Sequence, residues 1–100
     1  MPARRLAPLA FGMFGLLASG LSVSACTPTP LPEEGTAAQI LYAERCGGCH
    51  AVFQPSMLTG RMWDTMVSRM EVTMRRRGVP LAEADRTEIL AYLQRNAGKQ

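Results

Sequence analysis

Histidine and cysteine are scarce in this chain, which has one His and three Cys among 100 residues. A structural zinc site needs four Cys or His ligands, and no second ligand pair accompanies Cys46 and Cys49, because Cys26 is remote in the sequence. No strand-like alternation and no internal repeat appear, so a sheet protein and a repeat array are not expected. No nucleophile–base pair and no carboxylate dyad stand out. We therefore do not expect an enzyme.

Charged side chains are absent between Leu6 and Thr29, a stretch that follows Arg4 and Arg5. The apolar run LAPLAFGMFGLLASGLSVSA is long enough to span a bilayer as a helix. A basic start, an apolar middle and small residues before a candidate cleavage site are typical of a secretory signal. The small residues favour this second interpretation, and we predict that residues 1–25 are a signal peptide.

The sequence VSAC at residues 23–26 resembles the lipobox of bacterial lipoprotein signal peptides. The resemblance implies that the Cys26 thiol is acylated and that cleavage makes Cys26 the new N-terminus. The alternative is an ordinary signal peptide that is cleaved before an incidental cysteine. An exported chain with a leftover cysteine would carry a free thiol, and acylation removes it. We therefore predict a protein of the bacterial periplasm that is lipid-anchored to a membrane through Cys26.

The charge balance gives no support for a nucleic-acid partner. The chain has eleven Lys and Arg, and nine remain without Arg4 and Arg5, against eight Asp and Glu. The resulting net charge is about +1, whereas a nucleic-acid-binding domain needs a basic face well beyond this balance. No nucleic acid is expected among the partners.

A proline-rich segment at residues 26–34 follows the predicted signal. Pro28, Pro30 and Pro32 alternate with other residues, which favours extended polyproline II and disfavours helix. We predict that this segment is a linker with a rise of about 3 Å per residue. The domain that it carries is expected at residues 35–100.

Three segments of this domain have helical periodicity without an internal breaker. They cover residues 37–45, 61–77 and 82–96. Thr36 can cap the first helix, and Gly78 is expected to end the second. The stretch between these two helices is interrupted by Pro55 and Gly60 and is expected to be irregular. The predicted fold class is all-α, and a domain of roughly 65 residues buries so little apolar surface that something else must complete its core.

The sequence CGGCH places two of the three cysteines and the only histidine at residues 46–50. C-x-x-C-H is the attachment signature of c-type haem: Cys46 and Cys49 each form a thioether to one haem vinyl group, and His50 binds the iron. A disulfide is an alternative in an oxidising compartment. A thioredoxin-like pair would need a βαβ context, which is absent. Haem also explains the missing core, because a flat apolar cofactor can nucleate three short helices. We predict one covalent haem c.

With this motif, GTAAQILYAERCGGCH resembles the N-terminal helix and haem site of class I c-type cytochromes, and ILAYLQRNA resembles their C-terminal helix. The resemblance implies that these two helices cross and pack around the haem, with Tyr92 as the aromatic residue at the crossing and Gly35 or Ala38 allowing close approach. The pattern of Trp63, RGVPL and ILAYL also resembles small haem domains of dihaem cytochromes and of quinohaemoprotein subunits.

The sequence has no second histidine, so methionine is the available donor for the second axial position of the iron. Class I cytochromes usually supply it from a loop before the last helix, where this chain has none. In the small haem domains, a distal ligand lies some ten residues after a tryptophan, which corresponds here to Met74. Met70, one turn earlier on the same face, is the rival. A methionine stripe at this spacing also serves simply as core packing.

Two further groups have open roles. The Pro55 carbonyl could accept a hydrogen bond from the outer nitrogen of His50, or Pro55 could simply form a turn. Arg75, Arg76 and Arg77 could steer an acidic partner or pair with a haem propionate, although such a run is more often solvated helix surface.

These observations predict a periplasmic one-electron carrier that exchanges electrons with larger periplasmic or membrane redox proteins. Two alternatives remain open. If no methionine reaches the iron, the five-coordinate haem would bind or sense a gas. The chain could also be the haem subunit of a periplasmic dehydrogenase.

Overall fold

The computed structural model describes residues 28–99 and four isolated positions before them, 3, 12, 15 and 20. Apart from those four positions, the predicted signal peptide lies outside the described residues, and so does Cys26. None of the helices in the described part of the chain is long and apolar enough to span a bilayer.

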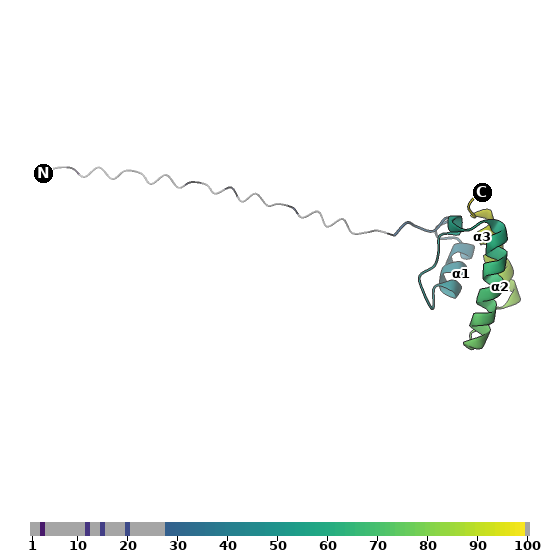
Figure 1. Cartoon of the computed structure of the whole chain (residues 1–100). Coiled ribbons are helices and arrows are strands. Elements are labelled where there is room, and N and C mark those ends of the chain that lie inside the picture. The colour runs from purple at the N-terminus through teal and green to yellow at the C-terminus, as the bar shows by residue number, and fades with distance from the viewer. Residues whose placement is uncertain (1–2, 4–11, 13–14, 16–19, 21–27, 100) are drawn as a thin grey trace.

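Three α-helices form the domain, and no strand occurs among the described residues (Figure 1). They are α1 (Ala37–Cys46), α2 (Gly60–Arg76) and α3 (Glu83–Arg95), with a short 3₁₀ turn at Pro55–Met57 between α1 and α2. The all-α class and the three expected helices are confirmed, each to within one residue at its ends.

The helix boundaries follow local capping chemistry. The Thr36 hydroxyl accepts from the Gln39 amide, as expected, and the Thr59 hydroxyl accepts from the Met62 amide in the same way. At the other end of α2, Gly78 adopts φ +74°, a left-handed conformation that glycine reaches without steric cost. Two threonines and one glycine therefore account for three of the six ends of the α-helices.

Helix α3 is the centre of the fold, because it packs against both α1 and α2. Its residues Ile89, Tyr92 and Leu93 are essentially inaccessible to solvent. Ala38 and Tyr42 of α1 are also buried, and the rings of Tyr42 and Tyr92 lie 5.5 Å apart in a tilted arrangement. The Tyr92 ring of α3 thus lies at the contact between α1 and α3. Of the two small residues considered for this contact, Ala38 is buried in α1, whereas Gly35 precedes the helix.

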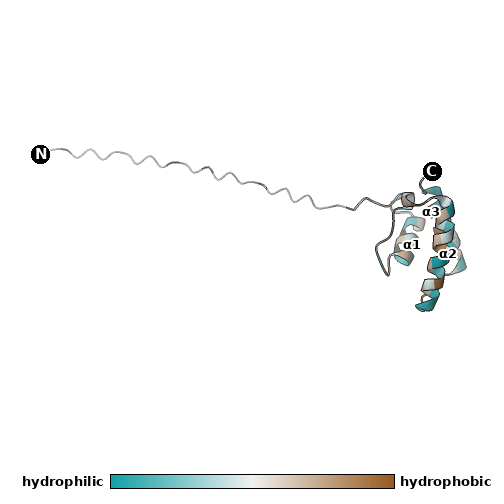
Figure 2. Cartoon of the chain, viewed as in Figure 1, coloured by the Kyte–Doolittle hydropathy of each residue, from teal (hydrophilic) through white to brown (hydrophobic). Residues whose placement is uncertain are grey.

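Helices α2 and α3 are also joined by an ion-pair cluster on their exposed side. Arg86 of α3 donates to Glu71 at 2.8 Å and to the Ser68 hydroxyl at 3.3 Å, and it lies 4.0 Å from Asp64. In Figure 2, hydrophilic and hydrophobic stretches follow one another along α2. The acidic side chains of α2 thus face α3.

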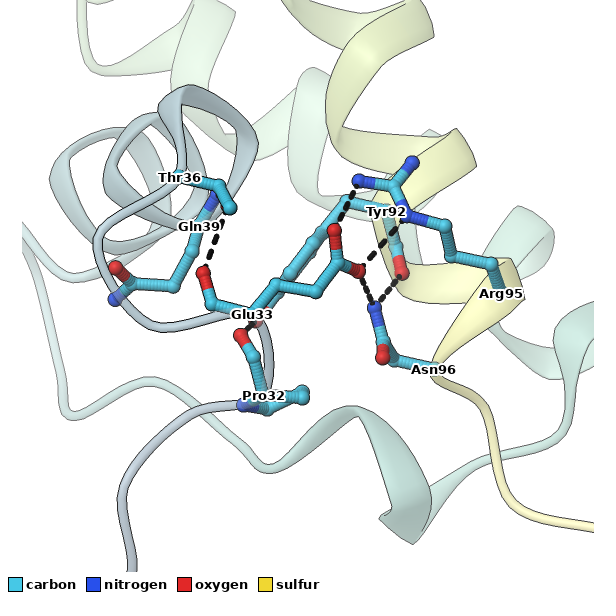
Figure 3. A network of polar contacts seen from close by, with 7 residues as sticks. All are labelled: Pro32, Glu33, Thr36, Gln39, Tyr92, Arg95 and Asn96. Carbon is cyan, nitrogen blue, oxygen red and sulfur yellow. Dashed lines mark hydrogen bonds and ion pairs between the residues drawn. The ribbon is translucent and has the colours of Figure 1, made fainter.

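The end of the proline-rich segment is held against α3 by a polar cluster, which we call the clasp (Figure 3). The carboxylate of Glu33 accepts from both Nε and Nη2 of Arg95 at 2.8 Å, and it also accepts from Asn96. The Tyr92 hydroxyl donates to the Pro32 carbonyl at 3.0 Å. These contacts join residues about 60 positions apart in the sequence.

Residues before the clasp are also bound to the domain. The Gln54 side-chain amide donates to the Thr29 carbonyl at 2.8 Å and to the Pro30 carbonyl at 3.1 Å, and Leu31 packs against the core. Residues 29–31 of the predicted linker are therefore bound to the helical domain. The C-terminal segment is bound to the connection between α1 and α2, since the Gly98 amide donates to the Leu58 carbonyl at 2.9 Å.

Candidate functional site

A predominantly apolar cavity lies between the three helices and the connecting segments, with a volume of about 710 Å³ including its open mouth. Fifteen residues line it: Tyr42, Arg45, Cys46, Cys49, His50, Val52, Phe53, Trp63, Met66, Val67, Met70, Met74, Leu81, Ile89 and Leu93. The cavity therefore contains the three residues of the CGGCH motif and both methionines that the sequence singled out.

The motif begins at the last residue of α1 and continues in an irregular segment. Cys46 is the C-terminal residue of α1, whereas Cys49 and His50 lie in the exposed turn that follows. Gly47 caps the helix with its amide bound to the Ala43 carbonyl, and a Cβ at this position would lie 2.4 Å from that oxygen. No atom lies within 4 Å of a Cβ at Gly48. The close contact with the Ala43 carbonyl thus requires glycine at position 47, whereas no contact requires it at position 48.

The two cysteines differ in their environment. Burial raises the pKa of the Cys46 thiol to about 11, whereas Cys49 is exposed. Both are free thiols in the described part of the chain, so the structure contains no disulfide between them. Both sulfurs remain available for bonds to a cofactor.

The His50 ring is oriented by its neighbour in the chain. Its Nδ1 lies 2.9 Å from the Ala51 carbonyl oxygen, and because a carbonyl only accepts, Nδ1 carries the proton. The lone pair of Nε2 is then free to bind a metal ion. The Pro55 carbonyl does not have this role. It accepts instead from the Trp63 indole at 2.7 Å, a bond that holds the buried tryptophan in the cavity wall.

The methionines divide into two groups. Met66, Met70 and Met74 project from α2 into the cavity lining, whereas Met57 is 63% exposed and Met62 is 48% exposed, and neither lines the cavity. Met70 and Met74 are one turn apart, as the helical spacing predicted. The structure brings both together with the CGGCH residues.

Several cavity residues were not predicted from the sequence. Tyr42, one turn before Cys46, donates its hydroxyl to the Phe53 carbonyl at 2.8 Å, and burial raises its pKa. Phe53 and Leu81 come from connecting segments that showed no periodic pattern. Arg45 is the only permanently charged residue in the lining, and it forms a 3.0 Å ion pair with Asp85. The helical spacing of Tyr42, four residues before Cys46, was the only available signal.

The residues of the cavity fit a haem group. Its walls are aliphatic, aromatic and thioether side chains, its mouth has two cysteines and a histidine in the attachment spacing, and Arg45 offers one positive charge to an anionic substituent. No cluster of three or more His, Cys, Asp or Glu that could bind a bare metal ion occurs among the described residues. A planar apolar cofactor with its own metal suits this donor set better than a metal ion alone does.

An all-α domain with CGGCH at the mouth of an apolar cavity defines a c-type cytochrome. The family model described as dihaem cytochrome c matches residues 42–100, which is more than half of the chain. The chain therefore belongs to the dihaem cytochrome c family: it is a haem-based electron carrier with covalently bound haem c. Comparisons with curated proteins and with solved structures gave no match.

Proposed function

We propose that this protein is a periplasmic one-electron carrier with a single covalent haem c, ligated by His50 and Met74. One observation carries the ligand assignment: a single cavity is lined by the CGGCH residues and by methionine sulfurs from α2. When bound, the haem supplies Fe(III)/Fe(II) cycling, and thioether ligation raises its reduction potential.

The protein residues have separate tasks in this proposal. Cys46 and Cys49 form the thioethers, and the Ala51 carbonyl holds the His50 ring in the ligating tautomer. Met74 binds on the side of α2, with Met70 as the rival. Trp63, Ile89 and Leu93, all buried, exclude water from the cofactor. Because electrons move without any bond being made or broken in a substrate, no catalytic residue is required.

The count of one haem rests on the sequence. A second covalent haem would need a second C-x-x-C-H motif and another histidine, and these 100 residues have one of each. The family description names two haems, so members with two motifs differ from this chain in that respect. A mass spectrum of the mature protein tests the count, since each haem c adds one haem mass.

Location and anchoring complete the proposal. A signal peptide at residues 1–25 would export the chain, and acylation of Cys26 would attach it to a membrane. The resemblance of VSAC to a lipobox supports this part. A Cys26→Ser variant tests it: the protein should appear in the soluble periplasmic fraction with its haem, whereas the unchanged protein should sediment with membranes.

The absorption spectrum of the haem-loaded protein tests the ligand assignment. The reduced protein should be low-spin and unchanged by CO, because both axial positions are filled. Met74→Ala should convert the iron to a high-spin, CO-binding form. Met62→Ala is the matched control, since it removes a methionine of the same helix that lies outside the cavity.

The other outcomes have definite meanings. A high-spin spectrum from Met70→Ala instead of Met74→Ala would make Met70 the ligand. A high-spin, CO-binding spectrum of the unchanged protein would contradict electron transfer through a six-coordinate iron and would indicate a gas-binding haem protein. Co-purification in a fixed ratio with a larger subunit would indicate a dehydrogenase subunit.

A further inference from the structure

A second hollow lies on the outside of the molecule, beside α2. It is a groove lined by Leu58, Met62, Thr65, Met66 and Arg69. Met66 also lines the haem cavity, and it is the only described residue that belongs to both. A single methionine side chain therefore separates this surface groove from the cofactor site.

The side of α2 that borders the groove is both apolar and basic. Met62, Arg69 and Arg76 follow one another at intervals of seven residues, so neighbours in this series lie about 20° apart around the helix and the first and last about 40° apart. All three are exposed, Met62 to 48%. Methionine and arginine are enriched at the centres of protein–protein interfaces.

The charges on this side have no partner within the described residues. Arg69 and Arg76 form no ion pair there, whereas Arg45 and Arg95 each form one and Arg86 forms two. The acidic residues of α2, Asp64 and Glu71, lie about 150° around the helix from Arg69, where they face Arg86. The groove side of α2 is thus positive, with no nearby carboxylate of its own helix to neutralise it.

We propose that this surface, formed by Leu58, Met62, Arg69 and Arg76, is where an acidic redox protein docks and exchanges electrons through Met66. The inference rests on the proposed electron-transfer function and deepens it by naming the class of partner and the contact surface. Charge complementarity identifies the partner as acidic, because the two unpaired arginines attract an acidic surface and repel a basic one. The apolar groove, which Arg69 borders, supplies the desolvated centre that such a contact needs. Electron tunnelling falls steeply with distance, so a groove one side chain from the cofactor favours transfer at this place.

The test uses the haem-loaded protein and a defined probe, a reduced plant-type ferredoxin, which is an acidic iron–sulfur protein. The second-order rate constant for reduction of the ferric haem is measured by stopped flow. At about 10 mM ionic strength, Arg69→Gln/Arg76→Gln should lower this rate constant about three- to ten-fold. The difference should largely disappear at about 1 M salt, where the Debye length is about 3 Å.

The matched control is Arg75→Gln/Lys99→Gln, which removes the same net charge elsewhere. Arg75 lies about 120° from Arg69 around α2, and neither control residue forms an ion pair within the described residues. A neutral small reductant should reduce all variants at the same rate, which shows that the haem site itself is unchanged.

The outcomes separate this inference from the proposed function. Equal rate constants for the two double variants would overturn the docking surface. Loss of binding to vesicles that contain anionic lipid, with unchanged reduction by ferredoxin, would also overturn it and would assign the surface to a membrane. In either case a low-spin, CO-insensitive spectrum would leave the electron-carrier function standing.

Discussion

The two ends of this small domain are held together in different ways. At the clasp end, polar contacts join segments that are far apart in the sequence: Glu33 to Arg95, Pro32 to Tyr92, Leu58 to Gly98. At the cavity end, where α1 and α2 finish, the wall is mostly apolar and the CGGCH turn is exposed. The comparison teaches that polypeptide contacts complete one end, whereas the other end is built to be completed by a cofactor.

The largest effect on stability is expected when the covalent attachment of the cofactor is removed. Cys46→Ala/Cys49→Ala should lose covalent haem, seen as loss of haem staining on a denaturing gel. The apolar wall then loses its contacts, and the unfolding midpoint should fall by at least about 15 °C. Hydrogen exchange of this variant should show more amide protection remaining at Tyr92 and Leu93 than at position 46. An unchanged haem-stained band would contradict covalent attachment through these residues.

A smaller effect is expected from the two glycines of the motif. Gly47→Ala places a Cβ against the Ala43 carbonyl and should cost about 1–3 kcal/mol of unfolding free energy. Gly48→Ala meets no protein atom and should change it by less than about 0.5 kcal/mol. Thermal unfolding of the haem-loaded variants measures both. Equal destabilisation by the two changes would mean that the Gly47 contact does not limit this turn.

The smallest effect concerns the clasp and depends on pH. Hydrogen bonds from Arg95, and then from Asn96, hold the pKa of Glu33 below its ordinary value of 4.5. Because the folded-state pKa is lowered, the Glu33 carboxylate stabilises the fold above pH about 4.5, and this contribution is lost as pH falls through the folded-state pKa. Glu33→Gln should therefore lower the unfolding midpoint slightly at pH 7 and have no effect at strongly acidic pH.

The neighbouring Glu34 provides the control for this titration. It is exposed and forms no ion pair within the described residues, so Glu34→Gln should follow the unchanged protein at every pH. A Glu33→Gln variant that is as stable as the unchanged protein at pH 7 would show that the clasp contributes nothing to folding.

The fold class was predictable because its signals are local. Thr36 is a capping residue, Gly78 adopts a conformation that suits glycine, and the apolar stripe of α2 has helical period. The candidate attachment residues could be named for the same reason, since C-x-x-C-H is a five-residue pattern. That Met70 and Met74 share one face of α2 followed from helical spacing, whereas the choice of Met74 came from the resemblance to small haem domains.

The contacts that the sequence did not reveal are those between distant segments. Alternating prolines predict an extended backbone, but nothing in residues 28–34 indicates that Gln54, Tyr92 and Arg95 bind it. The Pro55 carbonyl had two possible roles, and its partner is Trp63, eight residues further on. Irregular segments such as the one that contains Phe53 have no period from which a buried face can be inferred.

The binding of Thr29 by Gln54 has a mechanical consequence for the proposed anchor at Cys26. Only two residues then separate the acylated cysteine from the first restrained position, and even a fully extended chain of this length spans about 10 Å. The domain would be confined to a thin layer beside the bilayer, because no long flexible linker would separate it from the anchor. Encounters with a membrane-bound redox protein would then become a two-dimensional search, in which confinement raises the effective concentration without any added affinity.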